Sequence, residues 1–138
     1  RTLYRDEGDH RRNSLWPENR MRGGEAVPCD VISLDDAADM VPNLRAIKID
    51  AQGAEADIVA SGPRTLARTN LLWYVELWRY GLSNAGSSLD AVISVFEARG
   101  WVPVTSDWAE IRRGTARHTG HRSTDVLIQH ISQRREAA

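Results

Sequence analysis

Runs of apolar residues along the chain alternate with amphipathic segments, and five of these runs predict strands. "CDVISL" at 29–34 alternates apolar and polar residues, as a half-buried strand does. "LRAIKID" at 44–50 is rich in β-branched residues, and "LLWYVELW" at 71–78 is nearly all apolar, as expected of a strand covered on both faces. "WVPVT" at 101–105 and "TDVLIQHI" at 124–131 are the last two predicted strands.

Helices are predicted between these strands. A short one spans 35–41, a second spans 53–62 and is followed by Pro63, which is placed to open another turn, and the clearest lies within 87–100. Capping-box pairs precede the first and the last of them: Ser33 with Asp36, and Ser87 with Asp90. Residues 1–28 predict a short strand or hairpin followed by a loop, and residues 106–123 predict a long basic loop.

The alternation of strands and helices predicts right-handed βαβ units and a parallel sheet, within one α/β domain spanning 1–138. No helical pattern is recognised between the last two strands, so we expect that pair to be antiparallel. Pro103 places strand 101–105 at an edge, because proline cannot donate a ladder hydrogen bond. The predicted order is therefore 44–50, 71–77, 124–131, 101–105.

Composition narrows the class of protein. The chain is 41% hydrophobic and 27% charged, which is typical of a globular protein, and its net charge of −1 gives no global attraction to nucleic acid or anionic lipid. Cys29 is its one cysteine, and no apolar run is long enough to span a membrane. We therefore expect a soluble, cytoplasmic protein with no nucleic-acid or membrane partner.

Carboxylates stand where two predicted neighbouring strands end. Asp50 ends strand 44–50 and Glu76 lies near the end of the next strand, so both side chains are expected in the crevice beyond the carboxyl edge of the sheet. Gly53 lets the backbone approach a ligand, and Glu55 lies in the first turn of the following helix. Alternatives stay open: Asp50 caps that helix, Glu55 complements its dipole, and Glu76 pairs with an arginine.

The segment "VISLDDAADMVPNLRAIKIDAQGAEADIVASGPRTL" resembles the FkbM family of S-adenosylmethionine-dependent methyltransferases. The matching elements come in the family's order: Leu34-Asp35-Asp36, Lys48-Ile49-Asp50, Gly53-Ala54-Glu55 and Val75-Glu76, with "NSLW" at 13–16 similar to an upstream family segment. Ala51 and Gln52 depart from the residues usual in the family. The resemblance covers roughly 3–105.

The resemblance implies the C-terminal half of a class I methyltransferase-like (Rossmann-like) sheet, with its last strand antiparallel. It implies O-methylation of a small-molecule or sugar hydroxyl, with Asp50, Glu76 and Glu55 as candidate catalytic residues and Asp50, Gln52 and Gly53 as candidates for contact with S-adenosylmethionine. The ten glycines form no GxGxxG-like cluster, so the half that binds the cofactor is expected to be absent and activity of the chain alone stays uncertain. An uncovered strand 44–50 would then favour self-association.

Two other classes remain open: a non-catalytic remnant or interaction module of the same fold, and a metal-dependent enzyme that uses Asp50, Glu55 and Glu76. No metal site is predicted, because His118 and His121 form an HxxH pair without a third ligand. His130 is interpreted as a packed histidine, Lys48 as a partner of an acid, and Asp35 and Asp36 as helix-capping residues.

Overall fold

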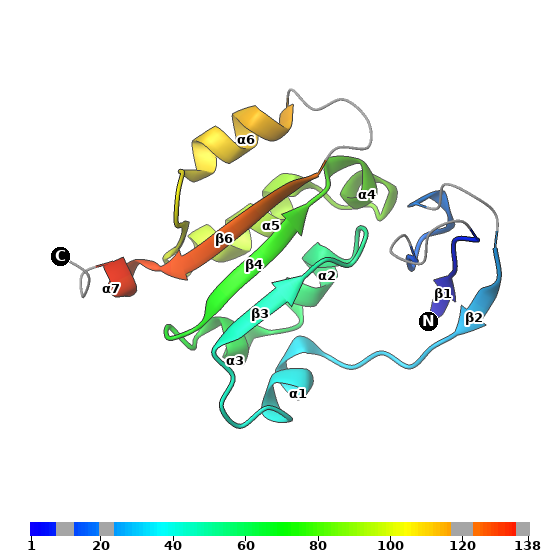
Figure 1. The fold of residues 1–138 in the computed structure, drawn as a ribbon, viewed down its shortest axis with the longest axis horizontal. Helices are drawn as coiled ribbons and strands as arrows, with labels where there is room; N and C mark the ends of the chain where they lie inside the picture. Colours follow the sequence, from blue (N-terminus) through cyan, green and yellow to red (C-terminus); the bar gives the residue numbers. More distant parts are fainter. Residues whose placement is uncertain (8–12, 20–23, 117–122, 135–138) are drawn as a thin grey trace.

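The computed structural model describes residues 1–7, 13–19, 24–116 and 123–134. This part of the chain is mixed α/β, with one four-stranded mixed sheet and one two-stranded sheet (Figure 1). The large sheet contains β3 (Ala46–Ile49), β4 (Leu72–Leu77), β5 (Trp101–Pro103) and β6 (Thr124–His130), and the small one pairs β1 (Thr2–Tyr4) with β2 (Ala26–Pro28).

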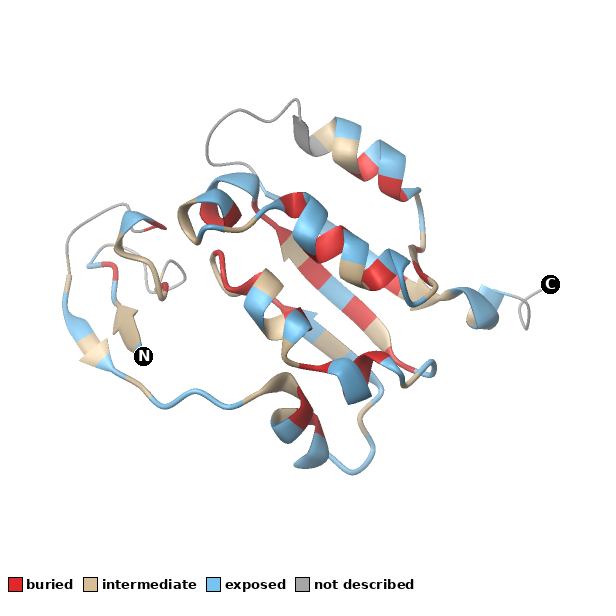
Figure 2. Cartoon of the chain, turned by 180° about the vertical axis from the view of Figure 1, so that it is seen from behind, coloured by how far each residue is buried: buried red, intermediate tan, exposed pale blue. Residues whose placement is uncertain are grey.

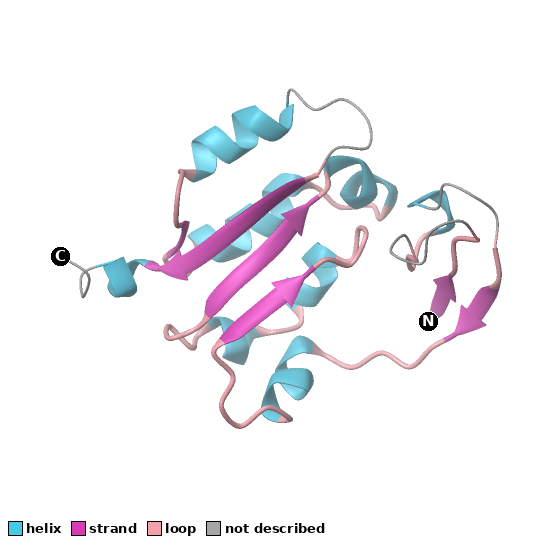
Figure 3. Cartoon of the chain, in the orientation of Figure 1, coloured by secondary structure: helices cyan, strands magenta, loops and turns pink. Residues whose placement is uncertain are grey.

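Helices connect most of the strands (Figure 3). Their bounds are η2, a 3₁₀ turn, Pro17–Asn19; α1, Leu34–Asp39; α2, Glu55–Ala60; α3, Pro63–Leu66; α4, Arg79–Asn84; α5, Leu89–Glu97; α6, Trp108–Ala116; and α7, Ile131–Arg134. Each helix among the described residues is too short or too polar to cross a lipid bilayer.

The predicted order of the large sheet is confirmed. The strands lie in the order β3-β4-β6-β5, with β3 parallel to β4 and β6 antiparallel to both of its neighbours. Pro103 lies on the edge strand β5, opposite Ile128 of β6. The proline thus identified the outer strand correctly, because its missing N–H is tolerated only there.

The predicted strand at 29–34 is wrong. The ladder with β1 ends as the Cys29 N–H donates to the Arg1 carbonyl, and α1 begins at Leu34. Residues 29–33 belong to neither sheet, and Val31 and Ile32 are 57% and 56% exposed. Alternation was a poor guide here because no strand among the described residues pairs with this segment beyond Cys29.

The predicted loop at 106–123 is also wrong in its first part, where α6 forms. The Glu110 N–H donates to Asp107 Oδ1 at 2.7 Å and the Asp107 N–H donates to Glu110 Oε2 at 3.2 Å, which makes a capping box. Trp108 and Ile111 of α6 are buried against the core. Residues 117–122, with His118 and His121, lie outside the described residues.

Two helix starts also differ from the prediction. Ser88, not Ser87, caps α5, since its hydroxyl accepts the Ala91 N–H at 3.1 Å. Helix α4 follows β4 directly and was not predicted, because its start has no side-chain cap.

Helices α2 and α5 cover one face of the large sheet, where the core lies (Figure 2). Trp73 of β4 stands at its centre, edge-on to Phe96 at 5.4 Å and to Trp101 at 5.8 Å between ring centroids. The opposite face is open: Tyr74 of β4 is 39% exposed and Leu127 of β6 is 36% exposed. The expectation that β4 is covered on both faces is therefore wrong for the described part of the chain.

Candidate functional site

A cluster of polar side chains lies at the carboxyl ends of β3 and β4. Ile49 of β3 pairs with Val75 of β4, so Asp50 and Glu76, the next residues, come side by side. The Gln52 side-chain amide donates to Asp50 Oδ1 and to Glu76 Oε2, each at 3.0 Å. One nitrogen thus binds both carboxylates, which confirms that Asp50 and Glu76 lie at the same edge of the sheet. We call Asp50 and Glu76 the acidic pair.

Gln52 owes its position to a strained backbone. Its φ of 50° lies in the left-handed region, and among the described residues it is the one non-glycine with a positive φ. Gly53 follows with φ of 107°. A non-glycine residue held there costs about 1–2 kcal/mol. The turn from β3 into α2 therefore places the Gln52 amide over the acidic pair at an energetic cost.

Two further side chains complete the cluster. Lys48 Nζ lies 3.0 Å from Asp50 Oδ2, so the expected pairing of Lys48 with an acid is confirmed. The Ser123 hydroxyl donates to Glu76 Oε1 at 2.6 Å. Glu76 therefore meets neutral donors, Gln52 and Ser123, where the sequence left an arginine partner open.

The two carboxyl groups differ in acidity. Partial burial acts to raise the pKa of Asp50, but the hydrogen bonds from Lys48 and Gln52 outweigh it and hold this pKa below its ordinary value. Partial burial raises the pKa of Glu76 above its ordinary value, and the negative charge of Asp50 adds to this effect against the hydrogen bond from Ser123. The cluster thus separates an ionised acid from one that keeps its proton more readily.

Glu55 is placed differently from the acidic pair. It is 0% exposed and accepts the N–H of Ala51 at 3.0 Å and of Gly53 at 3.0 Å. Burial raises its pKa, against the hydrogen bonds from these backbone groups. Glu55 therefore holds the turn of residues 51–53 together from inside and has no exposed surface with which to meet a substrate.

The aspartates of the α1 segment cap helices, as expected. Asp36 exchanges hydrogen bonds with Ser33 at the start of α1. Asp35 is buried and caps a second helix, α3, by accepting the Arg64 N–H at 3.1 Å and the Thr65 N–H at 2.8 Å. Neither residue belongs to the cluster.

Three residues of the site were missed in the sequence. Ser14 Oγ and Asn19 Nδ2 donate to the Gln52 carbonyl at 2.8 Å and 2.7 Å, and Ser123 bonds to Glu76. All three come from segments far from residues 50–53 in the chain, so local patterns carry no signal for them. The motif "NSLW" did mark Ser14, but only through the family resemblance.

His130, the one histidine among the described residues, takes no part in the cluster. His130 Nε2 lies 3.0 Å from the Arg99 carbonyl, His130 Nδ1 lies 2.8 Å from the Ser132 hydroxyl, and the ring stands edge-on to Trp101. This is the packed histidine that was expected. Within the described residues, no group of three histidine, cysteine, aspartate or glutamate side chains is arranged to hold a metal ion.

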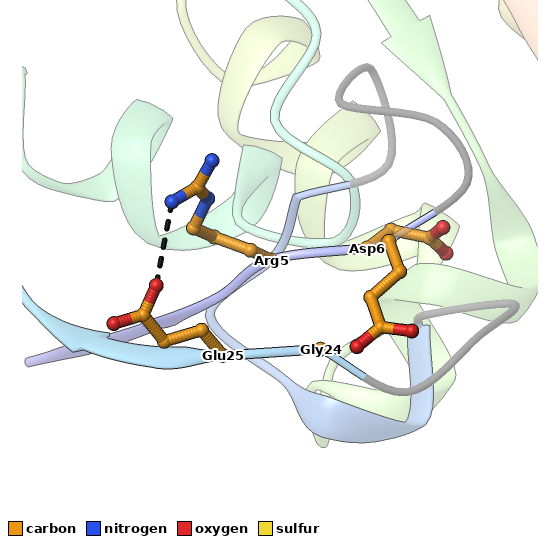
Figure 4. Close-up of a pocket in the computed structure, with 5 residues that line it drawn as sticks. Arg5, Asp6, Gly24 and Glu25 are labelled. Carbon is orange, nitrogen blue, oxygen red and sulfur yellow. Dashed lines mark hydrogen bonds and ion pairs between the residues drawn. The ribbon is translucent and has the colours of Figure 1, made fainter.

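Two cavities lie away from the acidic pair. One of about 250 Å³ lies beside the small sheet, where Arg5 reaches Glu25 at 3.4 Å (Figure 4). The other, of about 240 Å³, lies between residues 31–33 and α2. Neither of these two cavities is lined by Asp50, Gln52 or Glu76, so the cluster is a candidate site by the chemistry of its side chains.

The residues expected to contact S-adenosylmethionine fit it poorly. Gly53 is buried, and a Cβ there would lie 2.6 Å from Asn19 Nδ2 and 2.6 Å from the Gly81 carbonyl oxygen, so its missing side chain makes room for protein and not for a ligand. Both hydrogens of the Gln52 amide are directed to the acidic pair. Gly53 therefore has no open space, and the Gln52 amide no free hydrogen, with which to meet S-adenosylmethionine.

Comparison of the chain with models of protein families, with curated proteins and with solved structures finds no match in any of the three.

Proposed function

We propose that this chain is part of an S-adenosylmethionine-dependent O-methyltransferase of the FkbM type, which it resembles, and that the acidic pair receives the hydroxyl group of a small-molecule or sugar acceptor. The observation that carries the proposal is the shared Gln52 donor, which lies 3.0 Å from both carboxylates at the carboxyl ends of two parallel strands. Ligands of open α/β sheets bind at this edge.

The strand order supports the same proposal. An antiparallel strand inserted between a parallel strand and the edge is the arrangement that the resemblance implied for the end of a methyltransferase sheet, and β6 lies in this way between β4 and β5. The described residues contribute the acceptor side of the proposed site. The cofactor would supply the electrophilic methyl group.

Asp50 is the member of the acidic pair that would act as the general base. Its side chain is 38% exposed, and its pKa is lowered because the hydrogen bonds of Lys48 and Gln52 outweigh partial burial, so it is ionised at neutral pH. Asp50 would accept the hydrogen bond of the acceptor hydroxyl and would take up its proton. Lys48 and Gln52 would hold the carboxylate in place, and Glu76 would limit the negative charge of the site by keeping its proton more readily.

The test is methyl transfer by the protein that the reading frame encodes, with radiolabelled S-adenosylmethionine and a panel of sugars, alcohols and phenols. Asp50→Asn should lower kcat by about 10²–10⁴, the range of general-base catalysis. Asp39→Asn is the matched control, since Asp39 is an exposed acid at the end of α1 that pairs with Arg64 of α3. Absence of transfer to every acceptor, or a fully active Asp50→Asn, would refute the proposal.

A second candidate is an interaction module that keeps the sheet without catalysis. The open sheet face with Tyr74 and Leu127, next to the edge strand β3, favours it. Sequencing the reading frame upstream distinguishes the two: a Gly-rich strand–loop–helix supports the methyltransferase, and a start codon next to Arg1 supports the module.

A further inference from the structure

We propose that Ser14 and Asn19 are positioning residues: they clamp the carbonyl of Gln52 and so keep its side-chain amide between Asp50 and Glu76. The segment 13–19 thereby controls the acidic pair without touching it. The geometric part stands by itself, and only its consequence for catalysis rests on the proposed function.

The clamp consists of two side chains on one carbonyl oxygen. Ser14 Oγ lies 2.8 Å from the Gln52 oxygen and Asn19 Nδ2 lies 2.7 Å from it. Ser14 is 1% exposed and Asn19 is 2% exposed, so both donor side chains are shielded from water. The turn is therefore held through the backbone carbonyl of Gln52, while the side-chain amide of Gln52 binds the acidic pair.

The clamp is itself anchored at two places. Ser14 and Tyr4 exchange backbone hydrogen bonds of 2.7 Å and 3.0 Å, which ties the segment to β1. Asn19 Oδ1 accepts the Asn84 side-chain amide at 2.7 Å, which ties it to α4, the helix that follows β4. Asn19 thus connects α4 with the turn that follows Asp50.

The backbone of Gln52 explains why a clamp is needed. Its φ of 50° is unfavourable for a residue with a side chain, and without external bonds the turn would relax toward negative φ. Relaxation would swing the amide away from both carboxylates. Two hydrogen bonds from buried side chains to one carbonyl oppose this movement.

The groups that interact with the acidic pair come from several elements. They are Lys48 of β3, Glu55 of α2, Ser123, and, farther along the sheet, Tyr74 of β4 with its hydrogen-bonded Asp125 of β6. Ser14 and Asn19 carry no charge. Their effect on the pair must therefore pass through the position of Gln52 and not through electrostatics.

The experiment compares four variants of the full chain: Asn19→Leu, which keeps the volume without the donors; Ser14→Ala; Gln52→Gly, which deletes the bridging amide but accepts the turn; and Asn13→Leu. Asn13 is the matched control, because its side chain accepts the Asp6 N–H and does not reach Gln52. Carboxyl ¹³C NMR follows the titration of Asp50 and Glu76, and hydrogen exchange follows the Gly53 amide.

We expect Asn19→Leu and Ser14→Ala to raise the titration midpoint of Asp50, as Gln52→Gly does, because the bond from Gln52 is weakened. Loss of the Asn19 bond should also speed exchange of the Gly53 amide about tenfold, the factor for one strong hydrogen bond. Asn13→Leu should change neither quantity.

Several results would overturn the inference. A folded Asn19→Leu that titrates like the parent would show that the clamp does not control the pair, and an unchanged titration in Gln52→Gly would show that the bridge does not. If Asn19→Leu does not fold, an unaltered Ser14→Ala overturns it. Shifted titrations in a protein that methylates nothing would refute the proposed function alone.

Discussion

Replacing Gly53 by alanine tests the turn that supports the acidic pair. An added Cβ would lie 2.6 Å from the Gly81 carbonyl oxygen and 2.6 Å from Asn19 Nδ2, closer than real Cβ contacts allow. The φ of 107° is also unfavourable for any residue with a side chain. Gly53→Ala therefore combines backbone strain with a clash against backbone that cannot move easily.

Gly86→Ala is the matched control. Gly86 also has a positive φ, 73°, but a Cβ there would meet nothing within 4 Å. It should cost about 1 kcal/mol, since left-handed strain of ~1–2 kcal/mol is partly offset by the restricted unfolded chain. Gly53→Ala should cost about 3–4 kcal/mol, because strain of ~1–3 kcal/mol is joined by overpacking of similar size.

Urea denaturation followed by circular dichroism measures both free energies of unfolding. The difference between the two variants, about 2–3 kcal/mol, is the cost of the clash alone. If Gly53→Ala destabilises the protein no more than Gly86→Ala, the inference that Asn19 and α4 pack closely on this turn is refuted.

Other predictions concern stability, binding and association. Asp35→Ala should cost about 2–4 kcal/mol of stability, because it removes the cap of α3. Burial acts to raise the pKa of Asp35, but the hydrogen bonds from α3 outweigh burial and lower this pKa. The stabilisation by Asp35 is therefore present above the ordinary pKa of 3.8, and the difference in urea stability between parent and variant should narrow as the pH falls below that value. Trp101→Phe should cost about 1 kcal/mol more than Trp73→Phe in the same assay, because Trp101 Nε1 donates to the Leu66 carbonyl at 3.0 Å, whereas Trp73 Nε1 has no acceptor among the described groups; equal losses would contradict this. Calorimetric titration of the chain alone should show no micromolar binding of S-adenosylmethionine, and such binding by a monomer would refute the reading of the cofactor site. Light scattering should show self-association through the edge of β3, which Ala46→Lys should reduce by adding a charge to that strand; a monomeric parent would contradict it.

The order of the large sheet could be predicted because a few residues determine it. Pro103 excludes an inner position for its strand, and the apolar centre of 124–131 requires neighbours on both sides. Asp50 and Glu76 were found for a similar reason: equal distances along parallel strands bring side chains to the same edge. These predictions depend on rules of backbone pairing, which a sequence displays directly.

Other parts could not be predicted, for two physical reasons. The basic composition of 106–123 suggested a loop, so the capping box that Asp107 and Glu110 form was overlooked, although their spacing is visible in the sequence. The bonds of Asn19 to Gln52 and of Ser123 to Glu76 join distant segments, and only tertiary packing creates them. The left-handed conformation of Gln52 also depends on tertiary packing, since nothing in the local sequence favours glutamine in that conformation.

The insertion of β6 between β4 and β5 also constrains the order of assembly during synthesis. Strand β5 leaves the ribosome before β6 but has no place in the sheet without it, because β6 is its hydrogen-bonded neighbour. Until residues 124–130 emerge, the nascent chain must keep β5 and one edge of β4 unpaired, with Trp73 and Trp101 incompletely buried. A chain that terminates before Thr124 would therefore lack β6 and would leave β5 without a partner strand. Such a chain would be prone to aggregation and would depend on chaperones.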